Sequence, residues 1–234
     1  MPSAIGFSVA GTVFSESLLT VAPRIVEDAR LFLLPGDGPQ ASVRNWTGRA
    51  NASVIGTPSY HDGYAGVNGA NGFEGADPAS SGAFTYLTVQ TGNNVATGNL
   101  GLIGRWRDGE AQDLLYSFGT TAIALAIDGA QRHALTLPGP RTEMRFLGAR
   151  YDGASAKLWA SEGGALISSQ AAYAGTGAVK APLRVGGTSF QAGATANSDT
   201  RAAIAWDRAI SDQEVTACYE YLRALIASRG GSVE

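Results

Sequence analysis

The stretch from Arg201 to Ser228 constrains the fold of this chain more than any other. Residues 202–206 (Ala-Ala-Ile-Ala-Trp) are typical of a buried strand, and residues 211–214 have the Ser-x-x-Glu pattern of a helix capping box. Apolar residues then recur at helical spacing, at Val215, Cys218, Leu222, Leu225 and Ile226. A strand therefore leads directly into one amphipathic helix, which needs an apolar surface to cover.

The remainder of the chain predicts that this surface is a sheet. The chain has 31 glycines among 234 residues, about twice the usual share, which indicates many turns. Turn signals separate short strand-like segments about every 8–12 residues, a spacing typical of a β-sandwich. Asp128-Gly129 and Asp152-Gly153 are good hairpin turns, because glycine takes positive φ without strain. The strand-like segments are 31–34, 84–91, 100–106, 114–118, 123–127, 134–137, 146–151, 156–160, 165–169, 183–187 and 202–206.

These patterns predict an all-β fold, in which two antiparallel sheets form a jelly-roll sandwich. We expect the single C-terminal amphipathic helix, residues 212–228, to pack at an edge of the sandwich. Residues 25–234 form one jelly-roll domain. Residues 1–24 are mostly small and apolar, with Glu16 and Arg24 their only charges. They indicate an arm or edge strand that docks on its own domain or on a partner chain.

The charge balance excludes several kinds of partner. The net charge is −3, so we expect neither a nucleic-acid surface nor an anionic membrane surface.

No apolar run is long enough to insert across a membrane. The first twenty residues lack the basic start of a secretory signal. The single cysteine, Cys218, lies on the apolar stripe of the helix, where a core role fits better than a catalytic one.

Residues 201–226 resemble the closing strand and helix of laminin-G-like, or concanavalin-A-like lectin/glucanase, jelly-roll domains. In that family the last strand ends in an aromatic-Asp/Asn-Arg-Ala-Leu turn before Ser-Asp-x-Glu. Residues 146–159 resemble the family's Tyr-Asp-Gly hairpin and aromatic strand, and residues 183–187 resemble its next strand. The sequence departs from the family pattern at the 161–164 turn and at Arg201. The resemblance implies a jelly roll over about residues 30–228 and assigns no ligand site.

The sequence gives little support for catalysis. Hydrolases of the resembled fold place acid and nucleophile on one strand as Glu-x-Asp-x-(x)-Glu, and this chain contains no Glu-x-Asp. His61 and His133 are the only histidines, and no Gly-x-Ser-x-Gly elbow is present. We therefore predict a non-enzyme and keep a glycosidase or polysaccharide lyase as a second alternative.

Polar and aromatic residues gather in and around the irregular region 56–82, and long loops on a rigid scaffold commonly carry binding sites. Sugar recognition needs exposed rings to stack on pyranoses, and amides and acids to hold hydroxyl groups. Trp106, Trp159 and Trp206 lie on predicted strands, where we expect core positions instead. The candidate carbohydrate-binding residues are Trp46, Tyr60, Tyr64, Asn68, Asn71, Phe73, Asn93 and Asn94.

A calcium site is also possible by resemblance, since lectins and laminin-G domains of this fold often bind one calcium ion through loop oxygens. The candidate ligands form two groups. Asn71, Glu74 and Asp77 make one, and Asn197 with Asp199 makes the other. Simple solvation of acidic loops is the competing interpretation.

Two functions follow as expectations. The first is a non-catalytic module that recognises cell-surface carbohydrate, a polysaccharide or other glycan, as part of a phage-like spike, fibre or tail. The alternative is a structural or assembly protein, in which the jelly roll is a spacer and the 1–24 arm docks on another copy or on a virion protein. Both predict a location on a virion or phage-like particle surface, or otherwise an extracellular one reached without a signal.

Overall fold

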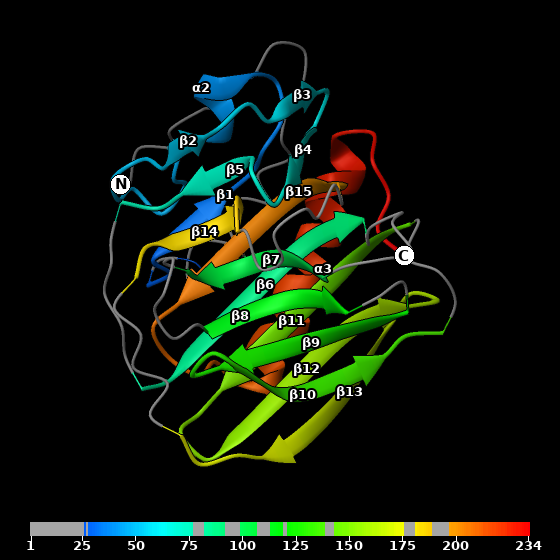
Figure 1. Ribbon diagram of the computed structural model, residues 1–234. Helices are drawn as coiled ribbons and strands as arrows, with labels where there is room; N and C mark the ends of the chain where they lie inside the picture. The colour runs from blue at the N-terminus through cyan, green and yellow to red at the C-terminus, as the bar shows by residue number, and fades with distance from the viewer. Residues whose placement is uncertain are drawn as a thin grey trace, which may run out of the picture.

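The computed structural model (Figure 1) describes residues 26, 28–76, 82–91, 99–106, 113–118, 121–138, 143–175, 181–188 and 197–234. The predicted 1–24 arm lies outside these residues, as do the candidate site residues Asp77, Asn93 and Asn94.

Most of the described chain is strand. The strands are β1 (Leu31–Leu33), β2 (Ser53–Ile55), β3 (Ser59–His61), β4 (Tyr64–Asn68), β5 (Gly72–Glu74), β6 (Phe84–Thr91), β7 (Asn99–Arg105), β8 (Asp113–Phe118), β9 (Ala122–Ile127), β10 (Ala130–Thr136), β11 (Met144–Tyr151), β12 (Ser155–Glu162), β13 (Ala165–Ala172), β14 (Leu183–Gly186) and β15 (Asn197–Trp206). The helices are α2 (Pro39–Ser42) and α3 (Asp212–Ser228).

The strands form two antiparallel sheets, which confirms the predicted sandwich. The first, here called the helix-side sheet, has the order β13-β12-β11-β6-β15-β4-β3, with β1 also paired to β15. The second sheet has the order β10-β9-β8-β7-β14-β5-β2. In each sheet a late strand, β15 or β14, lies between strands from the first and the middle parts of the chain (Figure 1).

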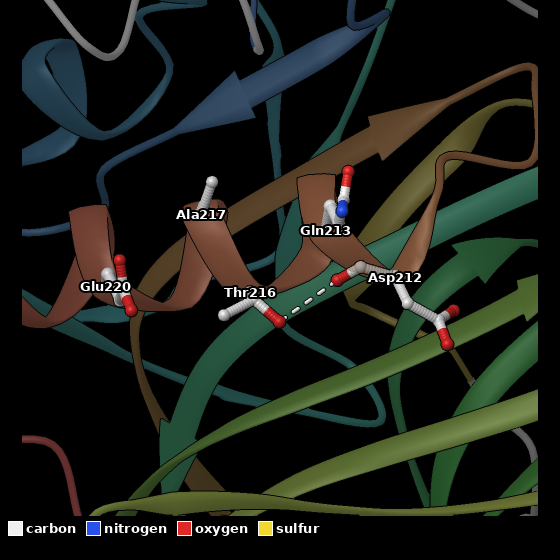
Figure 2. Close-up of a pocket in the computed structure, with 5 residues that line it drawn as sticks. All are labelled: Asp212, Gln213, Thr216, Ala217 and Glu220. Carbon is white, nitrogen blue, oxygen red and sulfur yellow. Dashed lines mark hydrogen bonds between the residues drawn. The ribbon is translucent and has the colours of Figure 1, made fainter.

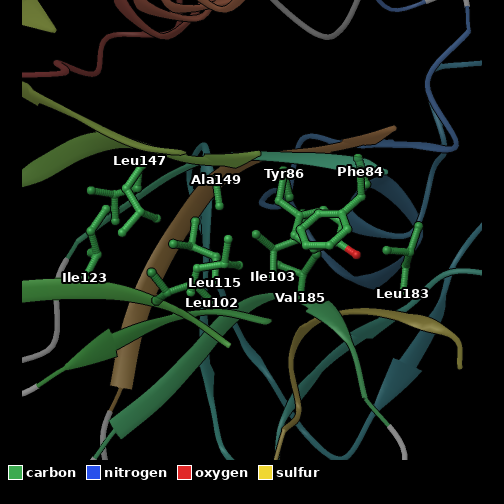
Figure 3. Close-up of a cluster of buried hydrophobic side chains, with 14 of the residues drawn as sticks. Phe84, Tyr86, Leu102, Ile103, Leu115, Ile123, Leu147, Ala149, Leu183 and Val185 are labelled. Carbon is green, nitrogen blue, oxygen red and sulfur yellow. The ribbon is translucent and has the colours of Figure 1, made fainter. Parts of the chain in front are cut away.

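The main core fills the space between the sheets, because alternate residues of each strand point inward. Phe84 and Tyr86 of β6 face Ile103 of β7 and Val185 of β14 in this layer (Figure 3). Leu87 and Val89, the intervening residues of β6, belong instead to a second apolar cluster on the outer face of the helix-side sheet. Strand β6 is therefore buried on both faces.

Helix α3 covers that outer face, so the expected packing at an edge of the sandwich is wrong. Leu222 and Ile226 of α3 pack in the outer cluster with Ile204 and Trp206 of β15. The predicted capping box is present, since the Ser211 hydroxyl accepts from the Glu214 amide while the Glu214 carboxylate accepts from the Ser211 amide. An amphipathic pattern identifies the buried stripe of a helix but not the surface that receives it.

The tryptophans and the cysteine expected in apolar surroundings are buried. Trp106, Trp159 and Trp206 are 7%, 4% and 0% exposed. Cys218 packs in the outer cluster with Trp159 and Trp206, and burial raises the pKa of its thiol to about 12. A thiol in this environment stays protonated and unreactive at neutral pH.

The region 56–82 is more regular than the sequence indicates. Its described part carries β3, β4 and β5, short strands that extend both sheets. Close packing requires a glycine at position 72, because a Cβ atom on Gly72 would lie 2.3 Å from the Val185 carbonyl oxygen. In the described part of the chain, no helix has the length and hydrophobicity of a membrane span.

Candidate carbohydrate-binding face

One end of the helix-side sheet carries a polar outer face that contributes nothing to the cluster under α3. It consists of β3, β4 and the first half of β15. Ala65 and Val67 of β4 are fully buried and point into the core. Their neighbours Tyr64, Gly66 and Asn68 therefore point to the outer face, where they lie opposite residues of β3 and β15.

The first row of side chains across this face is His61, Tyr64 and Arg201. The His61 and Tyr64 rings stack at 4.6 Å between centroids and 13° between planes. The Arg201 guanidinium carbon lies 5.3 Å from the Tyr64 centroid. Because β4 lies between β3 and β15, the Tyr64 ring is enclosed between its two neighbours. Tyr64 therefore presents its edge and hydroxyl group rather than a free ring face, and the exposed ring of the row is His61.

The second and third rows continue the same polar face. Ser59, Gly66 and Asp199 are paired across the three strands. Because Gly66 has no side chain, the Ser59 hydroxyl lies over it, 2.3 Å from where a Cβ atom would be. In the next row the Asn68 side-chain amide donates to Asn197 Oδ1 at 3.0 Å.

We call this polar face the trough. Its residues are Ser59, His61, Tyr64, Gly66, Asn68, Asn197, Asp199 and Arg201.

Two charged groups in the trough have unused hydrogen-bonding capacity. The described residues offer no donor to the Asp199 carboxylate, although the Asp199 backbone amide donates to Thr91 Oγ1 at 2.9 Å. Arg201 makes one long contact, from Nη1 to the Gly63 carbonyl oxygen at 3.5 Å, and its Nε is buried without a partner among the described residues. Arg201 lies two residues after Asp199 and so points to the same outer face, while a β-bulge between Thr200 and Ala202 turns Ala202 to that face as well.

The other aromatic candidates do not join the trough. Phe73 is 0% exposed in the main core, so its ring is unavailable for stacking and its proposed sugar contact is wrong. Tyr60 points inward against the same core, and burial raises the pKa of its hydroxyl. Trp46 packs against the cluster under α3, with the Arg44 guanidinium 4.1 Å from its ring centroid.

The calcium candidates are divided between two places. Asn71 Oδ1 accepts from the Thr57 amide at 2.8 Å, and Glu74 pairs with Arg184 at 2.8 Å, so both have protein partners. Asn197 and Asp199 lie together in the trough. Within the described ranges, no three His, Cys, Asp or Glu side chains gather closely enough to hold a metal ion.

A separate hollow of about 320 Å³ lies on the solvent side of α3, lined by Asp212, Gln213, Thr216, Ala217 and Glu220 (Figure 2). The described lining contains no aromatic ring. The Thr216 hydroxyl donates to the Asp212 carbonyl at 3.0 Å, and the Asp212 carboxylate is held by Lys157 and Arg150, which lower its pKa. Since Asp212 is already paired and the lining has no ring, this hollow is a weaker candidate for a sugar than the trough.

Ser59 and His61 are not among the binding residues predicted from sequence, and Arg201 is predicted only to depart from a family pattern. An alternation signal was available, because Tyr64-Ala65-Gly66-Val67-Asn68 alternates polar or small residues with buried apolar ones. The many glycines and amides of the region obscured it.

No protein-family model and no curated protein sequence matches this chain. Solved structures match its fold at low sequence identity. The binding domain of botulinum neurotoxin serotype D matches with a TM-score of 0.59 and 12% identity, over 86% of this chain and 52% of that one. The receptor-binding domain of the C/D mosaic serotype matches with a TM-score of 0.60 and 11% identity, over 83% of this chain and 51% of that one.

The binding domain of botulinum neurotoxin DC in complex with SialylT matches with a TM-score of 0.59 and 10% identity, over 84% of this chain and 52% of that one. The chain thus spans about half the length of the structures that it matches. At this identity the likeness establishes a shared β-sandwich fold.

Proposed function

We propose that this protein is a non-catalytic carbohydrate-binding module and that the trough is its binding site. The observation that carries the proposal is the row of polar groups on a rigid sheet face, above all the Asp199 carboxylate, which accepts no hydrogen bond from the described residues and lies on the same face as the Arg201 guanidinium. A carboxylate can accept from two adjacent sugar hydroxyl groups, and a guanidinium can donate to two oxygens at once.

The remaining trough residues suit the same class of ligand. Asn68 and Asn197 add amide groups, and Ser59 and Tyr64 add hydroxyl groups on the same face. The exposed His61 ring can pack against the apolar side of a pyranose. The receptor-binding domains that share the fold support a binding role rather than a catalytic one.

The biological setting belongs to the same proposal. We place the module on the surface of a phage-like particle, as part of a spike, fibre or tail that contacts bacterial polysaccharide; this rests on the family resemblance. A calcium ion at Asn197 and Asp199 is a further option, since both supply oxygens. The assembly alternative, with the 1–24 arm docked on a partner chain, is compatible with a sugar site on the helix-side sheet.

Binding to a panel of bacterial surface polysaccharides tests the proposal, with Asp199→Asn and Arg201→Gln as trough variants. Glu220→Gln, in the hollow on α3, is the matched control. We expect both trough variants to lose at least tenfold in affinity at an unchanged melting temperature, while the control binds normally. Repeating the assay with a chelator tests calcium, and measuring released reducing ends tests cleavage. Equal binding by all variants would remove the trough, and release of reducing ends would restore the glycosidase alternative.

A further inference from the structure

Strand β13 is an edge strand, and within the described part of the chain it has none of the features that usually protect such edges. Its sequence, Ala-Leu-Ile-Ser-Ser-Gln-Ala-Ala, contains no charge and no proline. It pairs with β12 through eight consecutive residues without a bulge. A long, regular and uncharged edge is a template for another strand, because its outer backbone groups are unpaired.

The other described edges are protected. Strand β10, at the same end of the second sheet, carries Arg132 and shifts register between Gln131 and His133. Strands β2 and β3, at the far ends of the two sheets, are three residues long. Among the described strands, β13 therefore stands out as the edge open to pairing.

The turn before β13 determines which of its backbone groups are open. Glu162 pairs with Ala165 across the two-residue turn Gly163-Gly164, whose φ angles of 56° and 80° fit a type I′ hairpin. In such a hairpin the closing pair is hydrogen-bonded, and hydrogen-bonded pairs alternate along the ladder. The backbone groups that point away from β12 are therefore those of Leu166, Ser168, Gln170 and Ala172.

We propose that β13 pairs with β13 of a second copy of this chain, in antiparallel orientation, to form a dimer with one continuous sheet. A second copy fits because the strand is self-complementary: pairing it with itself brings no like charges together and places small side chains at the centre. Leu166 and Ile167 are half-buried and pack against the two apolar clusters, so the partner strand would extend both.

The pleat restricts the register. Directly paired residues of antiparallel strands point to the same face, so the outer faces of the two copies match only if a residue pairs with its own counterpart. Ser168 or Ser169 at the centre satisfies this condition. A two-fold axis of this kind stands perpendicular to the sheet, so both outer faces point the same way.

The dimer also changes how the protein would bind a surface, a consequence that rests on the proposed function. The trough lies at the end of the helix-side sheet opposite β13. Two troughs would then face one side from the two ends of a continuous sheet. Linking two sites in this way raises the apparent affinity for a repeating ligand by about 10²–10⁴-fold without any new contact.

The experiment is the oligomeric state of the full chain by sedimentation equilibrium, without sugar. Ser168→Pro removes one outward N–H group and leaves the bonds to β12 intact, and Ser168→Lys places a charge at the centre of the interface. Thr136→Lys, an exposed position on the β10 edge, is the control. We expect a concentration-dependent dimer for the unmodified chain and the control, and folded monomers for both Ser168 variants.

A monomeric unmodified chain, or a dimer that survives Ser168→Pro, would overturn the proposal. So would a dimer lost only on deletion of residues 1–24, which would identify the arm as the interface. Sugar binding separates the two proposals: Ser168→Pro should keep the affinity for a soluble monovalent oligosaccharide and lose at least tenfold on a dense polysaccharide surface. If the unmodified chain bound no sugar at all, the trough would not be a binding site, and the result on the dimer would be unaffected.

Discussion

Arg105 and Asp113 form an ion pair inside the sandwich, with 2.8 Å between Nη1 and Oδ2 and both side chains 0% exposed. The Arg105 guanidinium also donates to the Tyr86 hydroxyl at 3.0 Å and pairs with Asp207, which is bound in turn by Arg30. This network connects β7 and β8 of the second sheet with β6 and the end of β15 in the helix-side sheet. Charges so deeply buried persist only when they are fully paired.

Removing the cation should therefore be costly. We expect Arg105→Met to lower the free energy of unfolding by about 3–5 kcal/mol at neutral pH, because it leaves the Asp113 carboxylate buried without its main partner. Urea denaturation measures the change. The double variant Arg105→Met with Asp113→Leu should recover part of the loss, and an Arg105→Met protein as stable as the original would show that the pair is dispensable.

The titration of Asp113 should contribute to the pH dependence of the unfolding free energy. Burial raises the pKa of this carboxyl from 3.8 to about 6, and Arg105 opposes the rise. The folded protein then holds the proton more tightly than the unfolded chain, so the contribution of Asp113 to stability is complete at low pH and decreases as the pH rises through this window.

Other carboxyl groups act in the opposite direction. Hydrogen bonds from Lys157 and Arg208 lower the pKa of Asp212 and Glu214, whose stabilising contributions are lost on acidification. Comparing the chain with Asp113→Asn isolates the buried group. As the pH rises from acidic to neutral, the original chain should lose unfolding free energy relative to Asp113→Asn. A constant difference between the two proteins would mean that the Asp113 pKa is the same in the folded and unfolded chains.

The contact between α3 and the sheet face is open to a direct test. Leu222 is 0% exposed in the outer cluster. We expect Leu222→Ala to cost about 2–5 kcal/mol, the usual range for a cavity in a packed core. Glu220→Ala, on the solvent side of the same helix, should change stability by less than about 0.5 kcal/mol. Similar effects for the two variants would mean that the helix does not pack as described.

Alanine substitutions at two glycines should affect sugar binding and stability differently. A Cβ atom on Gly66 would meet the Ser59 hydroxyl, which can rotate away, so Gly66→Ala should crowd the trough and weaken sugar binding at nearly unchanged stability. A Cβ atom on Gly72 would meet the Val185 backbone, which cannot move without separating β5 from β14, so Gly72→Ala should lower the melting temperature. Measuring binding and melting for both variants checks the contrast.

The features predicted correctly from sequence are those with a local cause. The capping box at Ser211 needs only two side chains three residues apart, and the alternation in residues 84–91 reports burial on each face of one strand. The Asp128-Gly129 turn likewise follows from local geometry, with φ angles of 53° and 73°.

The errors concern relationships between distant segments. The short strand β4 pairs with β15, and β3 pairs in turn with β4, so both depend on a strand more than a hundred residues later. The position of α3 depends on which sheet face is apolar. Half of the candidate site was predicted: Tyr64, Asn68, Asn197 and Asp199 do come together, although the last two were assigned to a metal. Arg201 joins them because it alternates with Asn197 and Asp199 along β15.

The position of β14 and β15 has a consequence for how the chain acquires its fold during synthesis. Residues 53–74 connect to the rest of each sheet only through strands that lie more than a hundred residues later. While the ribosome is still making the middle of the chain, this early segment can form only its own pairs, β3 with β4 and β2 with β5. The edges of these early strands stay exposed until residues 183–206 have been synthesised. Folding is therefore slow, because it depends on pairing between segments that are far apart in the sequence. A truncation that removed β15 would therefore release the beginning of the domain together with its end.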